Sequence, residues 1–285
     1  MAVRNLPQSP SYAGVEALRK AGGLVVAGSL FWLVHLGFTM AGVLLFAVYA
    51  GMNNAEGAAI AGAILFAGAL IAATVGAFLL AGGAFFEGAV ARGISAGATP
   101  GMRVHPAMGK VEQRGDRAGF CLLAFGACGI FAGILLVALG DLGPTLRPGS
   151  VLGIILGVGL VWAAASAVFA IAAADLTDSL DSIGRHVPSL ALRPAPNLRG
   201  YAYLYLAGTL ALILPLLPYS LAPPSPLQTA VCFFLFGLVI QGVIVPLAGF
   251  ATFVRLTRFG LEATRVGFPP PIPMGWPPLP PAGAK

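Results

Sequence analysis

Six long apolar runs alternate with short or charged segments along the chain. Each run has the length that a helix needs to cross about 30 Å of hydrocarbon, and a helix satisfies its backbone polar groups internally. The pattern therefore predicts an all-α polytopic integral membrane protein with six transmembrane helices. The predicted spans are residues 22–50, 57–86, 119–139, 151–174, 200–221 and 227–253.

The spacing of the runs predicts three tandem helical hairpins. Short links join the first span to the second, the third to the fourth and the fifth to the sixth, whereas longer charged segments separate these pairs. The expected division is an N-terminal segment, hairpin 1, a loop, hairpin 2, a second loop, hairpin 3 and a proline-rich tail. Their bounds are residues 1–21, 22–86, 87–118, 119–174, 175–199, 200–253 and 254–285.

Charge predicts the orientation. Of the 16 Lys and Arg residues, 15 lie in the terminal segments and the two long loops, and only Arg147 lies in a short link. Cytoplasmic loops of membrane proteins carry an excess of Lys and Arg. We therefore expect both termini and both long loops to be cytoplasmic, in a plasma or inner membrane, with the first span retained rather than cleaved as a signal peptide.

Composition agrees with a lipid environment. The chain of 285 residues is 58% hydrophobic and 9% charged, whereas a soluble domain carries about 25% charged residues. The net charge of +6 follows from the cytoplasmic loops and gives no reason to expect a nucleic-acid partner. The expected partners are the lipid bilayer and other membrane subunits or further copies of the chain.

Residues 41–93 are repeated at residues 132–184 without a gap. The two segments share 14 identities in 53 positions, including Gly68 with Gly159 and Phe78 with Phe169. This excess over chance is modest but favours an internal repeat of a helical hairpin. Repeats of this kind are common in transporters.

A stripe of small residues marks the expected packing seam. Small residues four apart let helix backbones approach closely in lipid. The stripe predicts helix–helix contacts in the bundle, with a groove for a lipid or pigment tail as the alternative. Its members are Gly68, Ala72 and Gly76 in the second span and Gly159, Ala163 and Ala167 in the fourth.

His35 is the only ionisable residue deep in a predicted span. Such residues are candidates for proton relay, substrate binding or cofactor ligation, although a neutral imidazole bonded to a neighbouring helix is the simpler interpretation. Gln241, in the sixth span, is the expected polar partner. No second deep His accompanies it, and the three Cys are interpreted as small buried hydrophobes, so no metal or cofactor is predicted.

Charged residues cluster where the spans meet the predicted cytoplasmic side. The expected role of this cluster is an ion-pair network that joins the hairpins, with a cation or proton entry site as the alternative. Its members are Glu87, Asp175, Asp178, Asp181, Arg255 and Arg258.

Aromatic and proline residues supply weaker signals. Tyr201, Tyr203 and Tyr205 are expected to form part of an aromatic belt at the membrane surface. Pro215, Pro218 and Pro246 lie within predicted spans and are expected to kink them. The tail should be polyproline II and is a candidate for docking on a partner through Pro270, Pro273, Trp276, Pro277 and Pro280.

The sequence contains no H-E-x-x-H, G-x-S-x-G or phosphate-binding glycine loop. The first functional hypothesis is therefore a non-catalytic membrane protein that acts by association, as a subunit or scaffold. The alternative is a small permease or channel for an ion or small solute. A third hypothesis is a lipid-acting enzyme that uses Glu87, His105, Asp178 or His186.

Overall fold

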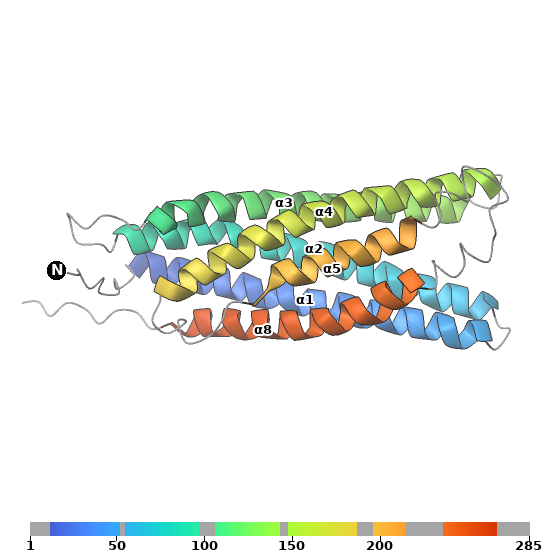
Figure 1. The fold of residues 1–285 in the computed structure, drawn as a ribbon, viewed down its shortest axis with the longest axis horizontal. Coiled ribbons are helices and arrows are strands. Elements are labelled where there is room, and N and C mark those ends of the chain that lie inside the picture. The colour runs from blue at the N-terminus through green and yellow to red at the C-terminus, as the bar shows by residue number, and fades with distance from the viewer. Residues whose placement is uncertain are drawn as a thin grey trace, which may run out of the picture.

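The computed structural model shows an elongated bundle of long helices (Figure 1). It describes residues 12–51, 55–96, 106–142, 148–186, 196–214 and 236–266, and these residues form no strand. The expectation of an all-helical protein is confirmed for them. Five helices are long and apolar enough to cross a membrane, at Gly14–Leu45, Ile60–Ala91, Gly109–Leu135, Leu156–Arg185 and Phe236–Arg265.

The helices are longer than the predicted spans. Helix α1 has 40 residues and α2 has 42, so each is about 60 Å long at 1.5 Å per residue. The ends of the predicted loops 87–118 and 175–199 are therefore helical, because backbone hydrogen bonding continues beyond the apolar run. The elements are α1 (Tyr12–Gly51), α2 (Ala55–Ala96), α3 (Pro106–Leu142), α4 (Pro148–His186), α5 (Leu198–Ile213), η2 (Ile240–Ile244) and α8 (Val245–Arg265).

Local sequence explains where three helices begin. Pro106 and Pro148 are the first residues of α3 and α4, a position that needs no N–H donor. Asn197 caps α5, where its side-chain oxygen accepts a hydrogen bond from the Gly200 N–H at 2.9 Å. The described part of α5 is short, at 16 residues, and the predicted span continues into residues that the structure does not describe.

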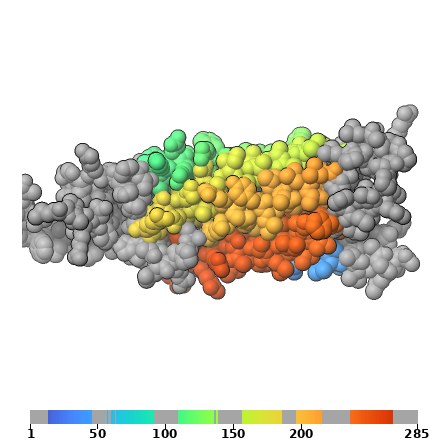
Figure 2. Space-filling view, in the orientation of Figure 1, coloured from blue at the N-terminus to red at the C-terminus, as the bar shows by residue number. Residues whose placement is uncertain are grey.

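Consecutive helices run in opposite directions, and α1 begins at the end of the bundle where α8 ends (Figure 1). The most extensive packing is between α1 and α2. Helix α2 also packs on α3, α3 on α4, α4 on α5, and α8 on α1. On one face of the molecule, α5 lies between α4 and α8 (Figure 2). Apart from Glu56 and Asp141, the described charged residues lie toward one end of the bundle.

Two glycine pairs bring α1 close to its neighbours. A Cβ on Gly28 would lie 3.0 Å from the Gly76 carbonyl oxygen, and a Cβ on Gly76 would lie 3.1 Å from the Gly28 carbonyl oxygen. Gly22 and Gly260 form an equivalent pair between α1 and α8, at 2.7 and 2.9 Å. Since any side chain would meet backbone atoms, these crossings require glycine.

The predicted small-residue stripe lies against helices of the same chain. Gly68 faces the Phe38 ring of α1, and Gly76 faces both Trp32 and Gly28. Gly159 faces Ile213 of α5. Ala72 and Ala163 are buried, whereas Ala167 is exposed. Most of the stripe is therefore occupied by internal packing, which leaves little of it for a separate partner.

The two copies of the sequence repeat occupy different environments. Gly68 packs on α1, within its own copy's hairpin, whereas its equivalent Gly159 packs on α5. Phe78 is 36% exposed, but its equivalent Phe169 is 2% exposed. Equivalent residues of the two copies therefore make different packing contacts, although their sequences are similar.

A π-helical turn precedes Pro246. Residues Ile240–Ile244 form η2, and the Val245 N–H donates to the Ile240 carbonyl five residues back. Proline has no N–H to donate, so the wider turn reorganises the hydrogen bonds on its N-terminal side. The predicted distortion near Pro246 therefore takes the form of a π-turn, and that turn contains Gln241.

Candidate functional site

An aromatic cluster organises the middle of the bundle around Trp32, which is fully buried. Its indole stacks on Phe169, with ring centroids 4.8 Å apart, and on Phe253, at 5.1 Å. Tyr201 and Tyr205 meet it edge-on. The cluster joins α1, α4, α5 and α8. Its packing therefore holds α1 in place near His35, one helical turn after Trp32.

The predicted aromatic belt at Tyr201, Tyr203 and Tyr205 is wrong for two of the three residues. Tyr201 and Tyr205 are 3% and 1% exposed, and only Tyr203, at 56%, faces outward. Residues four apart share a helix face, so Tyr201 and Tyr205 both point into the aromatic cluster.

His35 lies next to this cluster. Its Nδ1 is 2.9 Å from the Ala69 carbonyl oxygen of α2, and its ring meets Trp32 edge-on at 5.1 Å. A carbonyl can only accept a hydrogen bond, so Nδ1 carries the proton in this contact. In the neutral ring, Nε2 is then available to accept a hydrogen bond from another group.

His35 and Gln241 line the same cavity between the helices, which has a volume of about 320 Å³ and is partly open to the outside of the bundle. A second cavity of about 280 Å³ adjoins it and shares Thr39 and Gln241 among its lining residues. The Gln241 side-chain oxygen is buried and has no hydrogen-bond partner among the described residues. Gly208 of α5 makes room for this amide, because a Cβ at that position would collide with the oxygen.

Hydroxyl groups complete the polar lining. Thr39 donates to the His35 carbonyl at 2.9 Å, and Thr209 donates to the Tyr205 carbonyl at 2.9 Å. Ser166, behind Thr209, donates to the Trp162 carbonyl at 2.8 Å. Since these hydroxyl protons bond to backbone, the hydroxyl oxygens can still accept, and the few other polar groups of this mostly apolar lining are His35 Nε2, the Tyr205 hydroxyl and the Gln241 amide, which has both an acceptor oxygen and an N–H donor group. The sequence pattern singled out His35 and Gln241 but not Thr209 and Ser166, whose only signal is a hydroxyl inside an apolar run.

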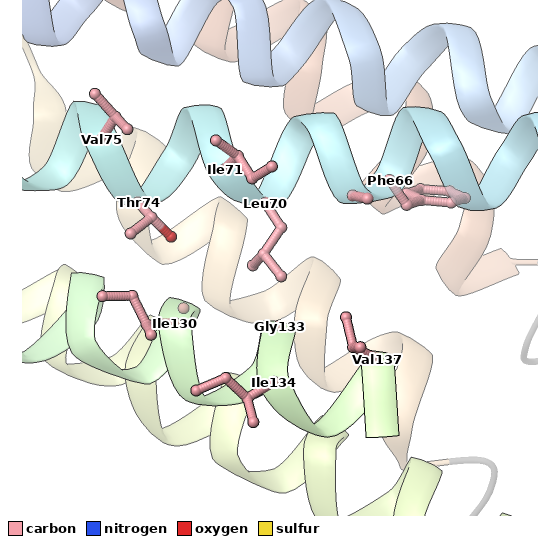
Figure 3. Close-up of a pocket in the computed structure, with 11 residues that line it drawn as sticks. Phe66, Leu70, Ile71, Thr74, Val75, Ile130, Gly133, Ile134 and Val137 are labelled. Atoms are coloured by element: carbon pink, nitrogen blue, oxygen red, sulfur yellow. The ribbon is translucent and has the colours of Figure 1, made fainter. Parts of the chain in front are cut away.

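A larger apolar groove lies between α2 and α3 (Figure 3). Its volume is about 930 Å³, and among the described residues that line it only Thr74 has a polar side chain. Phe66 and Leu70 line both this groove and the cavity that His35 lines. Leu70 and Thr74 of α2 point toward α3, and Ile130, Ile134 and Val137 line the groove from α3.

The predicted charge cluster divides into two parts. Asp175 pairs with Arg117, Asp178 pairs with Arg114 at 3.4 Å and Arg199 at 3.3 Å, and Asp181 pairs with Arg185. These contacts join α3, α4 and α5. Arg255 and Arg258 are exposed on α8 and take part in none of these pairs. Glu87 is buried, at 1% exposed, and lies outside the network as well.

The Asp175–Arg117 and Asp181–Arg185 ion pairs should contribute differently to the free energy of unfolding. We expect Asp175→Asn to lower the free energy of unfolding by roughly 1–3 kcal/mol, because the buried carboxylate orients the Arg117 guanidinium. Asp181→Asn is the matched control, since both members of its ion pair are exposed, and its effect should stay within about 0.5 kcal/mol. Unfolding by SDS in mixed micelles measures both values. Equal losses of stability in Asp175→Asn and Asp181→Asn would contradict the conclusion that Asp175 is buried and Asp181 is exposed.

Several predicted residues lie outside the described part of the chain. They include His105, Pro215, Pro218, Cys232 and the tail from residue 267 onward, and the His186 side chain is also not described. Cys121 and Cys128 are half-buried free thiols. Among the described residues, no group of three or more His, Cys, Asp or Glu side chains is placed to hold a metal ion.

The described helices have the length and composition of a multi-pass membrane protein, and the cavity that His35 and Gln241 line lies between them. Comparison with known proteins finds no matching family model, no similar curated protein and no similar solved structure.

Proposed function

We propose that the chain crosses a plasma or inner membrane six times as three tandem hairpins, with both termini cytoplasmic. The distribution of Lys and Arg supports this orientation, as does the collection of charged residues toward one end of the bundle. On this topology the aromatic cluster and the cavity that His35 lines lie within the membrane, away from the charged end.

We infer that the protein is a small permease for a neutral solute that carries hydrogen-bond donors. The observation that carries this inference is the unpartnered Gln241 oxygen in the cavity that His35 also lines. Polar groups inside a membrane are costly, and an unsatisfied buried acceptor favours a site that a ligand or water completes. This proposal includes no catalytic step.

The elements around the cavity also fit transport. Gln241 lies on a π-turn, and such turns are frequent at functional sites. Interrupted helices near the bilayer midplane form the binding sites of many transporters. A mostly apolar lining with a few neutral polar groups, and with no carboxylate among the described lining residues, favours small neutral solutes such as alcohols, amides and uncharged amines over anions.

The expected result of Gln241→Leu is a loss of solute flux of roughly tenfold, corresponding to about 1.4 kcal/mol for one lost hydrogen bond. The assay measures uptake of glycerol, urea and methylamine into liposomes that contain the purified protein. Gln113→Leu is the matched control, because Gln113 is exposed on α3. Uptake by the wild-type protein no faster than by empty liposomes, for all three solutes, would contradict the proposal.

The second candidate is association, as a subunit or scaffold with other membrane proteins or further copies of this chain. The specific observation that favours it is the apolar groove between α2 and α3, which is large enough to receive side chains of a partner helix (Figure 3). The proline-rich tail adds a proposed docking segment. Native mass measurement after gentle detergent extraction separates the two candidates, because stoichiometric additional chains would favour association and a lone chain would favour the permease.

A further inference from the structure

Glu87 is a buried carboxyl group that the cavity does not use. It lies near the charged end of α2, 18 residues and about 27 Å along the helix from Ala69, which contacts His35. Its side chain is 1% exposed, and neither carboxyl oxygen has a hydrogen-bond partner among the described residues. A buried ionised carboxylate without a partner is strongly disfavoured.

Helices α3 and α4 enclose this carboxyl group. Gly115 of α3 allows the close approach, since a Cβ there would lie 3.3 Å from Glu87 Cβ and 2.7 Å from the Ala84 carbonyl oxygen. Ser179 of α4 presents its hydroxyl to Glu87 and is fully buried. The Ser179 oxygen also has no hydrogen bond of standard geometry, so two unpartnered polar groups face each other.

The nearby cations are engaged elsewhere. Arg117 pairs with Asp175, and both Arg114 and Arg199 pair with Asp178. On α3, Glu112 and Asp116 lie beside Gly88, the residue after Glu87. The other charged residues at this end are Arg92 on α2, Lys110 on α3, the paired Asp181 and Arg185 on α4, and those at the start of α1 and the end of α8: Glu16, Arg19, Lys20, Arg255, Arg258, Glu262 and Arg265.

We propose that Glu87 and Ser179 form a proton-binding site between α2, α3 and α4, in which Glu87 is a neutral carboxylic acid that donates a hydrogen bond to Ser179. Binding converts the carboxylate and one proton into the acid and transfers no other atom. Asp178, the residue before Ser179 on α4, is partly exposed and pairs with Arg114 and Arg199, so groups in contact with water lie close to the site. This short distance lets the proton exchange with the solution.

Infrared spectroscopy of the purified protein in detergent tests the proposal. At neutral pH the wild type should show the C=O stretching band of a protonated carboxylic acid, and the band should vanish in Glu87→Gln. Asp181→Asn, which changes an exposed and ion-paired acid, should retain it. Ser179→Ala should shift the band frequency, because the hydrogen bond is lost. Absence of the band from the wild type, or its persistence in Glu87→Gln, would overturn the proposal.

Two further measurements use the unmodified protein. Raising the pH should remove the band in one reversible step, and a band that never titrates would overturn exchange with solution. Adding sodium chloride at constant pH, against choline chloride at equal ionic strength, should leave the band unchanged. Its loss on addition of sodium would instead assign the site to a metal cation. None of these outcomes depends on solute flux through the His35 cavity.

Discussion

Replacement of Trp32 by alanine should lower the free energy of unfolding by about 3–5 kcal/mol, the range for removal of a large buried aromatic side chain. Trp32 is fully buried and contacts rings from α3, α4, α5 and α8. Inside a membrane the loss comes from van der Waals packing rather than from transfer out of water, because lipid is as apolar as the protein core. The loosened packing should also displace His35, one turn away.

Phe120→Ala is the matched control for this prediction. The Phe120 side chain is 66% exposed on α3, so its removal takes away few internal contacts. SDS unfolding in mixed micelles, followed by circular dichroism, measures both variants. If Trp32→Ala and Phe120→Ala shift the unfolding curve equally, the aromatic cluster is not the centre of the bundle.

Gly22→Leu should disrupt the packing of α8 on α1 and destabilise the protein by roughly 3 kcal/mol, the upper part of the usual range for an overpacked site. A Cβ on Gly22 would lie 2.7 Å from the Gly260 carbonyl oxygen, a backbone atom that cannot move aside without shifting α8. Because α8 continues from the π-turn that holds Gln241, the same change should also reduce solute flux.

The adjacent residue supplies the control. Gly23 is exposed, and a Cβ there would meet no heavy atom within 4 Å. Gly23→Leu introduces the same side chain into the same helix, so the two variants differ chiefly in the α1–α8 contact. Comparable unfolding midpoints for Gly22→Leu and Gly23→Leu would show that the close crossing is absent.

The sequence predicts the helices well because apolar length is a strong signal in a membrane protein. Which face of each helix points inward is harder to read, since lipid-facing and core-facing residues are both apolar. Tyr201 and Tyr205 illustrate the difficulty: position near a span end favoured a surface belt, yet both rings are buried around Trp32. The helix rotation that places them there follows from packing between helices distant in sequence.

The sequence identifies the important polar residues, but it does not predict which helices surround each of them. His35 and Gln241 stand out because they interrupt apolar runs, and the structure brings them to one cavity. Glu87 and Asp178 occupy equivalent positions of the repeat, 91 residues apart, and the sequence places both in the charge cluster. In the structure Asp178 forms ion pairs, whereas Glu87 is enclosed by α3 and α4. Equivalent positions in a repeat acquire different neighbours because the first and second copies pack against different helices.

The coupling between His35 and Gln241 tests whether both side chains bind the same solute in the cavity. Solute flux into liposomes would be measured for wild type, His35→Leu, Gln241→Leu and the double variant, with each reconstituted amount matched. If both side chains contact one bound solute, the effects of the two substitutions on solute flux should not be additive. The flux of the double variant should then be only slightly lower than that of the more impaired single variant. Flux that is unchanged in both single variants, or losses that multiply in the double variant, would contradict a shared binding site in the cavity.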